Sequence, residues 1–219
     1  MPKIKTVLFD LDGTLADTAP DLAAALNHVL TQHDCETLPF ETIRPFVSHG
    51  GAALVTLGFG KDHPEFDLLY KELLDFYQAN IANETTLFPG MSELLLELEA
   101  NNMNWGVVTN KPAWLTDPLM QALNLSSRAV TIVSGDTLEF RKPHPAPILH
   151  ACQQAGSHAN ECLYVGDAER DIEAGNAAGM LSIVALFGYI AATDTPDTWG
   201  AYTAIQSPQE ISALIQSLN

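Results

Sequence analysis

The feature that most constrains this chain is a short apolar run that ends at two closely spaced carboxylates. Residues 7–9 read Val-Leu-Phe, and residues 10–14 read Asp-Leu-Asp-Gly-Thr. This pattern predicts a buried strand followed by a tight turn, in which Gly13 lets the backbone bend where a Cβ would obstruct it. The strand therefore delivers two acids to a single turn.

The chemistry of these two acids depends on their surroundings. Carboxylates this close repel each other, so both stay ionised only beside a cation, and otherwise one keeps its proton at neutral pH. Because side chains alternate along an extended segment, Asp10 and Asp12 can point to one side, leaving the amides of Leu11 and Asp12 free to meet an anion. A bare Asp-x-Asp-Gly equally fits an ordinary connection that uses Asp and Gly only for turn chemistry.

Alternating helices and strands are predicted from residue 88 onward. The expected strands cover residues 105–108, 130–133, 163–165 and 182–186, and the expected helices cover 91–102, 113–123 and 141–155, with a last helix opened by 207–210. This alternation is typical of βαβ units, so the predicted fold class is α/β, with a doubly wound, Rossmann-like parallel sheet as its core.

Polar residues follow three of the predicted strands at the points where they end. Asp10 and Asp12 come after the first strand, Thr109 after the strand at 105–108, and Asp167 after the strand at 163–165. In an open parallel sheet the carboxyl ends of the strands form the crevice where ligands bind. These distant parts of the sequence are therefore predicted to converge on one place.

Residues 16–85 lack a convincing strand and are predicted to form a helical insertion. Thr18 to Asp21 has the form of a capping box, and apolar residues follow it at helical spacing. Residues 62–65 open a second helix in the same way, with an apolar face formed by Leu68, Leu69, Leu73 and Phe76. We predict a small helical bundle over 16–85, inserted into a core formed by 1–15 and 86–219.

Composition limits the classes of partner and compartment. The balance of 10 basic and 27 acidic residues gives a net charge of −17, which disfavours nucleic acid and anionic membranes as partners. The chain shows no signal-peptide pattern at its start and no apolar stretch long enough to span a bilayer. Its scattered cysteines, Cys35, Cys152 and Cys162, lack metal-type spacing and indicate a reducing compartment. We expect a cytoplasmic protein, either a monomer or a homodimer.

The run Phe-Asp-Leu-Asp-Gly-Thr-Leu at residues 9–15 resembles the first motif of the haloacid dehalogenase (HAD) superfamily. Most members are magnesium-dependent phosphatases with an aspartate nucleophile. The other motifs follow in family order, as Thr-Asn at 109–110, Lys-Pro at 142–143 and Gly-Asp-Ala-Glu-Arg-Asp at 166–171. The resemblance covers essentially the whole chain and implies a HAD-like core with a helical cap over the site.

A closer similarity is to the phosphoglycolate phosphatase group of this superfamily. Within that group, residues 106–112 and 188–190, with Trp-Gly-Ala at 199–201 behind them, resemble the N-acetylmuramic acid 6-phosphate phosphatases. The resemblance therefore implies a small-molecule phosphate ester as substrate.

The resemblance implies a role for each motif residue that contacts the phosphoryl group. Asp10 is the nucleophile that forms an aspartyl-phosphate, and Asp12 is the general acid for the leaving group and then the base for water. Lys142 balances the charge on the nucleophile and the phosphoryl oxygens. Thr109 supplies a hydroxyl, and Asn110 a backbone amide, to those oxygens.

The resemblance also implies a Mg²⁺ site. Asp10, the backbone carbonyl of Asp12, and Asp167 are the expected ligands, while Asp171 orients a coordinated water or a neighbouring side chain. Position 168 is Ala where relatives often carry an acid or a serine. Taken alone, the Gly-Asp-x-x-x-Asp pattern also fits a strand-to-helix turn with Asp as N-cap.

Two further groups are assigned from their position. His49 and Gly50 lie in the predicted cap and are expected to contact substrate, although a lone histidine is more often structural. Four of the ten basic residues flank the motifs, namely Lys111, Arg141, Lys142 and Arg170. In a chain of charge −17, this clustering favours a locally positive site.

Together these features predict a Mg²⁺-dependent phosphomonoester hydrolase that acts on phosphoglycolate or on a sugar phosphate such as N-acetylmuramic acid 6-phosphate. Two alternatives remain open. A phosphosugar mutase of the same fold shares every motif and differs in how its cap keeps water out. A non-catalytic phosphometabolite-binding module would leave the acids idle. Release of free phosphate separates the hydrolase from both.

Overall fold

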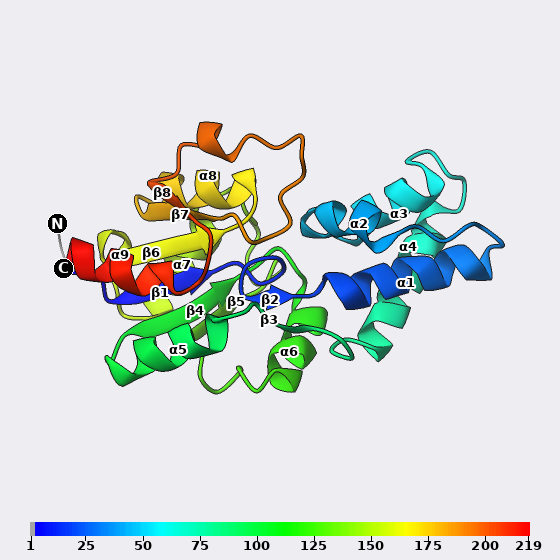
Figure 1. Ribbon diagram of the computed structural model, residues 1–219. Helices are drawn as coiled ribbons and strands as arrows, with labels where there is room; N and C mark the ends of the chain where they lie inside the picture. Colours follow the sequence, from blue (N-terminus) through cyan, green and yellow to red (C-terminus); the bar gives the residue numbers. More distant parts are fainter. Residues whose placement is uncertain (1–2) are drawn as a thin grey trace.

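The computed structural model describes residues 3–219, and within them a six-stranded parallel sheet forms the centre of the molecule (Figure 1). The strand order is β5-β4-β1-β6-β7-β8. The strands are β1 (Thr6–Phe9), β4 (Asn104–Val108), β5 (Thr131–Val133), β6 (Cys162–Gly166), β7 (Leu181–Ala185) and β8 (Thr203–Ile205). Because β1 pairs with β4 on one side and β6 on the other, the sheet is wound in both directions from its centre. The predicted α/β class is confirmed.

Helices cover both faces of this sheet. One face packs against α5 (Met91–Ala100), α6 (Ala113–Ala122) and α9 (Glu210–Leu218), and the other against α7 (Ala146–Gln154) and α8 (Glu169–Ala177). Side chains alternate along β1, so Val7 and Phe9 enter the first apolar cluster while Leu8 enters the second. Short 3₁₀ turns, η2 (Ala159–Glu161) and η3 (Pro196–Thr198), lie in the connections.

The predicted insertion leaves and re-enters the core through a two-stranded antiparallel ribbon that the sequence did not predict. β2 (Ala16–Asp17) pairs with β3 (Thr86–Leu87). Between them lie α1 (Ala19–Gln32), α2 (Phe40–Ile43), the 3₁₀ helix η1 (Arg44–His49), α3 (Gly51–Phe59) and α4 (Phe66–Ala79). We call residues 18–85 the helical insertion. Figure 1 shows it beyond the end of the sheet where β1 and β4 terminate.

The predicted capping box at the start of α1 does not form. The hydroxyl of Thr18 donates to Asp12 Oδ1 at 2.6 Å instead of capping the helix. The carboxylate of Asp21 accepts hydrogen bonds from the backbone amides of Glu84 and Thr85. Both side chains bond to residues outside the helix instead of capping it. The hydrogen bonds that Asp21 accepts from Glu84 and Thr85 connect the two ends of the helical insertion.

The second predicted helix differs in its start and in its buried face. α4 begins at Phe66, after a turn that contains the predicted cap residues. Its buried residues are Leu69, Leu73 and Tyr77, whereas Leu68 is 47% exposed. These three buried residues lie four positions apart along α4, and the sequence analysis did not include Tyr77 in the apolar face. Among residues 3–219, no helix combines the length and apolar character that crossing a membrane requires.

Candidate active site

The loops that follow β1, β4 and β6 meet at one edge of the sheet. Asp10 follows Phe9 at the end of β1, Thr109 follows Val108 at the end of β4, and Asp167 follows Gly166 at the end of β6. Because β1 lies between β4 and β6, these three side chains are brought together. The structure therefore places the sequence-predicted residues at a common edge.

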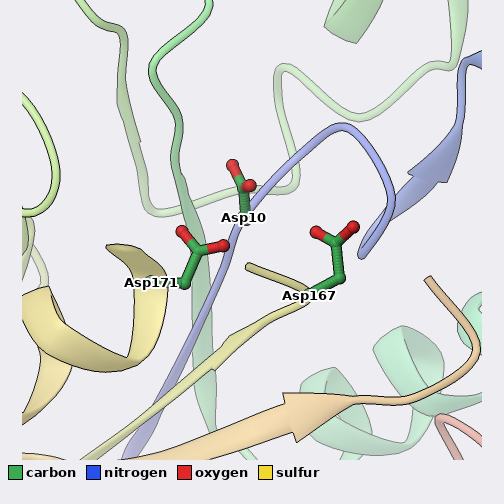
Figure 2. A group of neighbouring side chains, drawn as sticks. All are labelled: Asp10, Asp167 and Asp171. Carbon is green, nitrogen blue, oxygen red and sulfur yellow. The ribbon is translucent and has the colours of Figure 1, made fainter. Parts of the chain in front are cut away.

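Three buried carboxylates form the centre of this edge. One oxygen each from Asp10, Asp167 and Asp171 lies within 4.8 Å of the others. Figure 2 shows the three side chains gathered at this edge. Burial, reinforced by the charge of Asp171, raises the pKa of Asp10 to about 7 and that of Asp167 to about 6. Three acids in one buried cluster thus favour a nearby cation.

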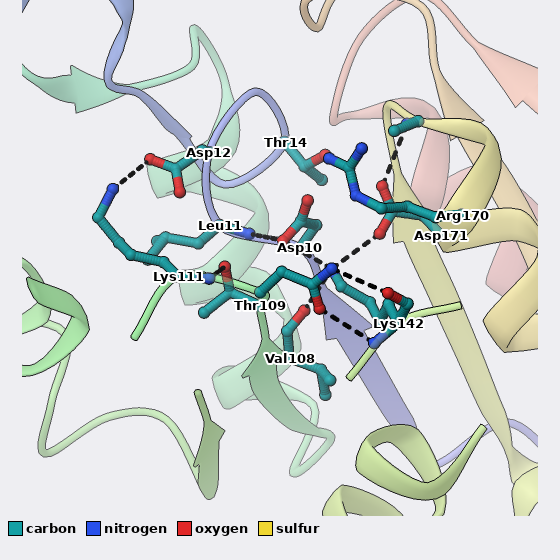
Figure 3. Close-up of polar contacts among 12 residues, drawn as sticks. Asp10, Leu11, Asp12, Thr14, Val108, Thr109, Lys111, Lys142, Arg170 and Asp171 are labelled. Carbon is teal, nitrogen blue, oxygen red and sulfur yellow. Dashed lines mark hydrogen bonds and ion pairs between the residues drawn. The ribbon is translucent and has the colours of Figure 1, made fainter. Parts of the chain in front are cut away.

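Lys142 supplies one such cation. Its Nζ lies 2.8 Å from Asp10 Oδ1 and 2.7 Å from Asp171 Oδ1, and it donates to the carbonyl of Val108 (Figure 3). It also donates to the hydroxyl of Tyr164. An ammonium has three hydrogens for these four neighbours. Asp171 Oδ1 is accordingly an ion-pair partner that accepts no directed hydrogen bond in the described structure.

The carboxylate cluster fits a divalent metal ion. Asp171 Oδ1 is buried without a hydrogen bond, and a single lysine does not neutralise three acids. Hard oxygen donors at this spacing suit Mg²⁺. The carboxylate of Asp12 is directed elsewhere, so only its backbone carbonyl remains as the predicted ligand from that residue.

Gly13 allows the first loop to approach Asp167. Its φ is +86°, and a Cβ at this position would lie 2.3 Å from Asp167 Oδ2. Asp167 also accepts hydrogen bonds from the hydroxyl of Thr14 at 3.1 Å and from the amide of Tyr189 at 2.9 Å. The turn predicted at Gly13 is therefore also required for close packing against the carboxylate cluster.

Asp10 and Asp12 have separate cationic partners. Asp12 Oδ1 accepts from Lys111 Nζ at 2.8 Å, whereas Asp10 pairs with Lys142, as Figure 3 shows. The amide of Leu11, which we expected to be free for an anion, donates to Asp10 Oδ1 at 2.7 Å. That expectation is wrong because the adjacent carboxylate reaches the amide first.

Thr109 and Asn110 hold the neighbouring loops. Thr109 is buried, and its Oγ1 accepts the amide of Lys111 at 3.1 Å, which leaves its own hydroxyl hydrogen for another acceptor. The side chain of Asn110 accepts the amide of Lys142 at 3.0 Å and donates to its carbonyl at 2.9 Å. Asn110 thus fixes the loop that carries Lys142, a role that the sequence analysis did not predict.

A cavity of about 500 Å³ lies between this edge and the helical insertion. Its lining includes most of the predicted site residues: Asp10, Asp12, Thr109, Asn110, Lys142, His49 and Gly50. In the part of the chain that the structure describes, Asp167 and Asp171 lie outside this lining. The helical insertion contributes a mainly apolar wall that includes Leu22, Val47, Tyr70, Leu74 and Tyr77.

The family model described as "Haloacid dehalogenase-like hydrolase" matches residues 7–185, which span the sheet from β1 to β7, the helical insertion and the carboxylate cluster. The chain belongs to this hydrolase family. The resemblance inferred from the motifs is therefore confirmed.

Relatives similar to this HAD-family chain include phosphatases named for two different substrates. It is 40% identical over 208 residues to a phosphoglycolate phosphatase of Xanthomonas campestris, covering 94% of each chain. It is 39% identical over 218 residues to an N-acetylmuramic acid 6-phosphate phosphatase of Pseudomonas putida, covering 98% of this chain and 97% of the relative. A crystal structure of a predicted phosphoglycolate phosphatase from Haemophilus somnus superposes with a TM-score of 0.86 at 26% identity, covering 98% and 99% of the two chains.

In this HAD-family chain the helical insertion contacts the carboxylate cluster directly. The hydroxyl of Ser48 donates to Asp167 Oδ2 at 2.6 Å, and the guanidinium of Arg170 donates to the carbonyl of Ser48. Arg44 donates to the carbonyls of Phe187 and Gly188. Sequence reasoning missed Ser48 and Arg44, although Ser48 directly precedes His49, which was assigned to the predicted cap.

His49 lines the cavity and is exposed. Partial burial of its ring and the positive charge of Arg170 lower its pKa. Its position is compatible with the predicted contact to substrate, which stays a prediction.

The raised pKa values predict how the stability of metal-free protein depends on pH. Between the ordinary carboxylate pKa of 3.8 and about 7, the folded state binds more protons than the unfolded state, so the free energy of unfolding falls as pH rises. We expect a fall on the order of 7 kcal/mol, because each pH unit of pKa shift corresponds to about 1.4 kcal/mol and the two shifts act together. Chemical denaturation with a metal chelator present should show a shallower fall for Asp167→Asn than for wild type. Equal slopes for the two proteins would contradict the assignment.

Removing the central cation should destabilise the fold. Lys142→Met retains the length of the side chain but leaves Asp10 and Asp171 buried without their ion pair. We expect a loss of about 3–5 kcal/mol in the free energy of unfolding of metal-free protein at pH 8. Lys71→Met is a matched control because the Lys71–Asp75 pair is exposed, and it should change stability by less than about 1 kcal/mol.

Proposed function

We propose that this HAD-family hydrolase is a Mg²⁺-dependent phosphomonoester hydrolase that acts through an aspartyl-phosphate. The observation that carries the proposal is the arrangement of two carboxylates at the floor of one cavity, each beside its own lysine. Asp10 pairs with Lys142, and Asp12 pairs with Lys111. Two acids held apart in this way can perform different tasks, one as nucleophile and one as proton carrier. The relatives named as phosphatases support the same class.

The first step is attack by Asp10 on the phosphoryl group. Lys142, the hydroxyl of Thr109 and the amide of Asn110 stabilise the negative charge on the phosphoryl oxygens. Asp12 gives its proton to the departing alkoxide, and the alcohol leaves. In the second step Asp12 takes a proton from water, which attacks the aspartyl-phosphate and releases phosphate.

Asp10, Asp167 and Asp171 are the side chains that would hold Mg²⁺, together with the carbonyl of Asp12. When bound, the ion supplies positive charge that offsets the carboxylates and orients the phosphoryl group. The clustering of three buried carboxylates around a single lysine and the raised pKa values of Asp10 and Asp167 support a second cation at this position.

We propose that residues 16–85 are a cap on a catalytic core formed by 1–15 and 86–219. The apolar wall that the helical insertion contributes would exclude water and contact the leaving group. A cavity of about 500 Å³ falls in the range of pockets that enclose whole small molecules. This volume favours a sugar phosphate such as N-acetylmuramic acid 6-phosphate over the much smaller phosphoglycolate.

The partner that we propose is therefore a small phosphate ester, with neither nucleic acid nor a membrane as ligand. The net charge of −17 supports this choice. Three free cysteines support a cytoplasmic location. We propose a monomer or a homodimer.

The test is phosphate release with Mg²⁺ from N-acetylmuramic acid 6-phosphate and 2-phosphoglycolate, measured side by side. We expect a higher kcat/KM for the amino sugar. A preference for phosphoglycolate would overturn the substrate choice while retaining the phosphatase. Isomerisation of a sugar phosphate without phosphate release would indicate a mutase, and binding without turnover would indicate a non-catalytic module.

A further inference from the structure

Tyr77 brings an aromatic ring from the helical insertion to the floor of the cavity. It lies on α4, is fully buried, and its ring centroid is 4.6 Å from Lys111 Nζ. Its hydroxyl has no hydrogen-bond partner in the described structure. The contact that joins Tyr77 to the floor is therefore the one between its ring and the ammonium of Lys111.

Lys111 contacts Tyr77 and Asp12 with the same ammonium group. Its Nζ lies 2.8 Å from Asp12 Oδ1, and its side chain is 6% exposed. Burial acts to lower the pKa of Lys111, but the negative charge of Asp12 outweighs it, so the net pKa is raised and the group stays charged. The three side chains come from the loop after β1, the loop after β4, and α4.

A lysine has a flexible four-carbon stem, so an ion pair alone does not fix where its ammonium lies. A ring face within about 6 Å attracts the cation and restricts it. In this structure the ring lies beside an ion pair that is itself largely buried. The arrangement is suited to holding Asp12 in one orientation.

We propose that Tyr77 and Lys111 are a positioning pair, in which the ring fixes the ammonium and the ammonium fixes the carboxylate of Asp12 toward the leaving group. The proposal rests on the proposed function, in which Asp12 carries the proton. Because Tyr77 belongs to the helical insertion, the proton carrier is fully positioned only when the helical insertion lies on the core.

The test uses kcat/KM for two esters with Mg²⁺. An alkyl phosphate needs a proton on its leaving oxygen, whereas p-nitrophenolate departs without one. Tyr77→Leu should lower kcat/KM for the alkyl ester about 3- to 30-fold, and Tyr77→Phe, which keeps the ring, should retain most of it. Both variants should lose much less with p-nitrophenyl phosphate. Tyr77→Met replaces Tyr77→Leu if the latter does not fold, as judged by its unfolding midpoint.

A double-mutant cycle completes the test. Lys111→Met should lower kcat/KM for the alkyl ester at least as much as Tyr77→Leu does. The double variant with both substitutions should have a kcat/KM only slightly below that of Lys111→Met. If the free-energy losses of the two single variants add up in the double variant, the proposal that Tyr77 and Lys111 act as a pair is wrong. Equal losses for Tyr77→Phe and Tyr77→Leu would overturn it too, because they would assign the effect to the free hydroxyl. A wild-type protein that releases phosphate from neither ester would overturn the proposed function and this proposal together.

Discussion

Asp10→Asn is expected to abolish phosphate release, lowering kcat/KM by about 10⁴-fold or more. An amide cannot attack the phosphoryl group to form the covalent intermediate, so the first step of the proposed reaction is lost. The substitution preserves the shape of the side chain. Its Oδ1 can still accept the amide of Leu11, which donates to Asp10 at 2.7 Å.

The control for this variant is its stability. Burial and the charge of Asp171 raise the pKa of Asp10 to about 7, so the ionised carboxylate is unfavourable in metal-free protein above that pH. Asp10→Asn should therefore unfold at the same temperature as wild type or higher when measured at pH 8 with a chelator. Rapid quenching should detect a phosphorylated intermediate in wild type and none in the variant. Phosphate release within tenfold of wild type would refute Asp10 as nucleophile.

The central sheet could be predicted because its strands are continuous apolar runs that end at polar residues. The segments at 105–108 and 163–165 match β4 and β6 to within a residue at each end, and Thr109 and Asp167 follow them directly. The ribbon of β2 and β3 could not be predicted in this way. Its strands are two residues long, too short to show a period, and only their mutual pairing defines them.

Contacts between residues far apart in the sequence were the second feature that the sequence analysis could not predict. Lys111 stood out as one of four basic residues beside the motifs, but nothing local indicates that it pairs with Asp12, 99 residues away. Thr18 fits a capping pattern, yet its hydroxyl goes to the same carboxylate. In both cases the partner lies on another segment of the chain, so the contacts of Asp12 became visible only in the fold.

Asp12→Asn is expected to separate substrates by their leaving groups. For a sugar or alkyl phosphate we expect kcat/KM to fall about 10²- to 10⁴-fold, because the departing alkoxide no longer receives a proton. For p-nitrophenyl phosphate the fall should be far smaller, since the nitro group stabilises the negative charge on the departing phenolate. The ratio of the two kcat/KM values therefore reports on proton donation alone.

The hydrogen bonds around Asp12 allow its proton-carrying role to be tested separately from its structural role. An asparagine can still accept from the hydroxyl of Thr18 and the ammonium of Lys111, so the loop should keep its structure. Thr18→Val is a matched control, because it removes a hydrogen bond to the same oxygen without removing the proton carrier, and it should lower both kcat/KM values by a similar small factor. Equal losses on both esters for Asp12→Asn would show that Asp12 maintains the loop rather than carrying a proton. A selective loss for the sugar or alkyl phosphate would place the transferred proton on Asp12.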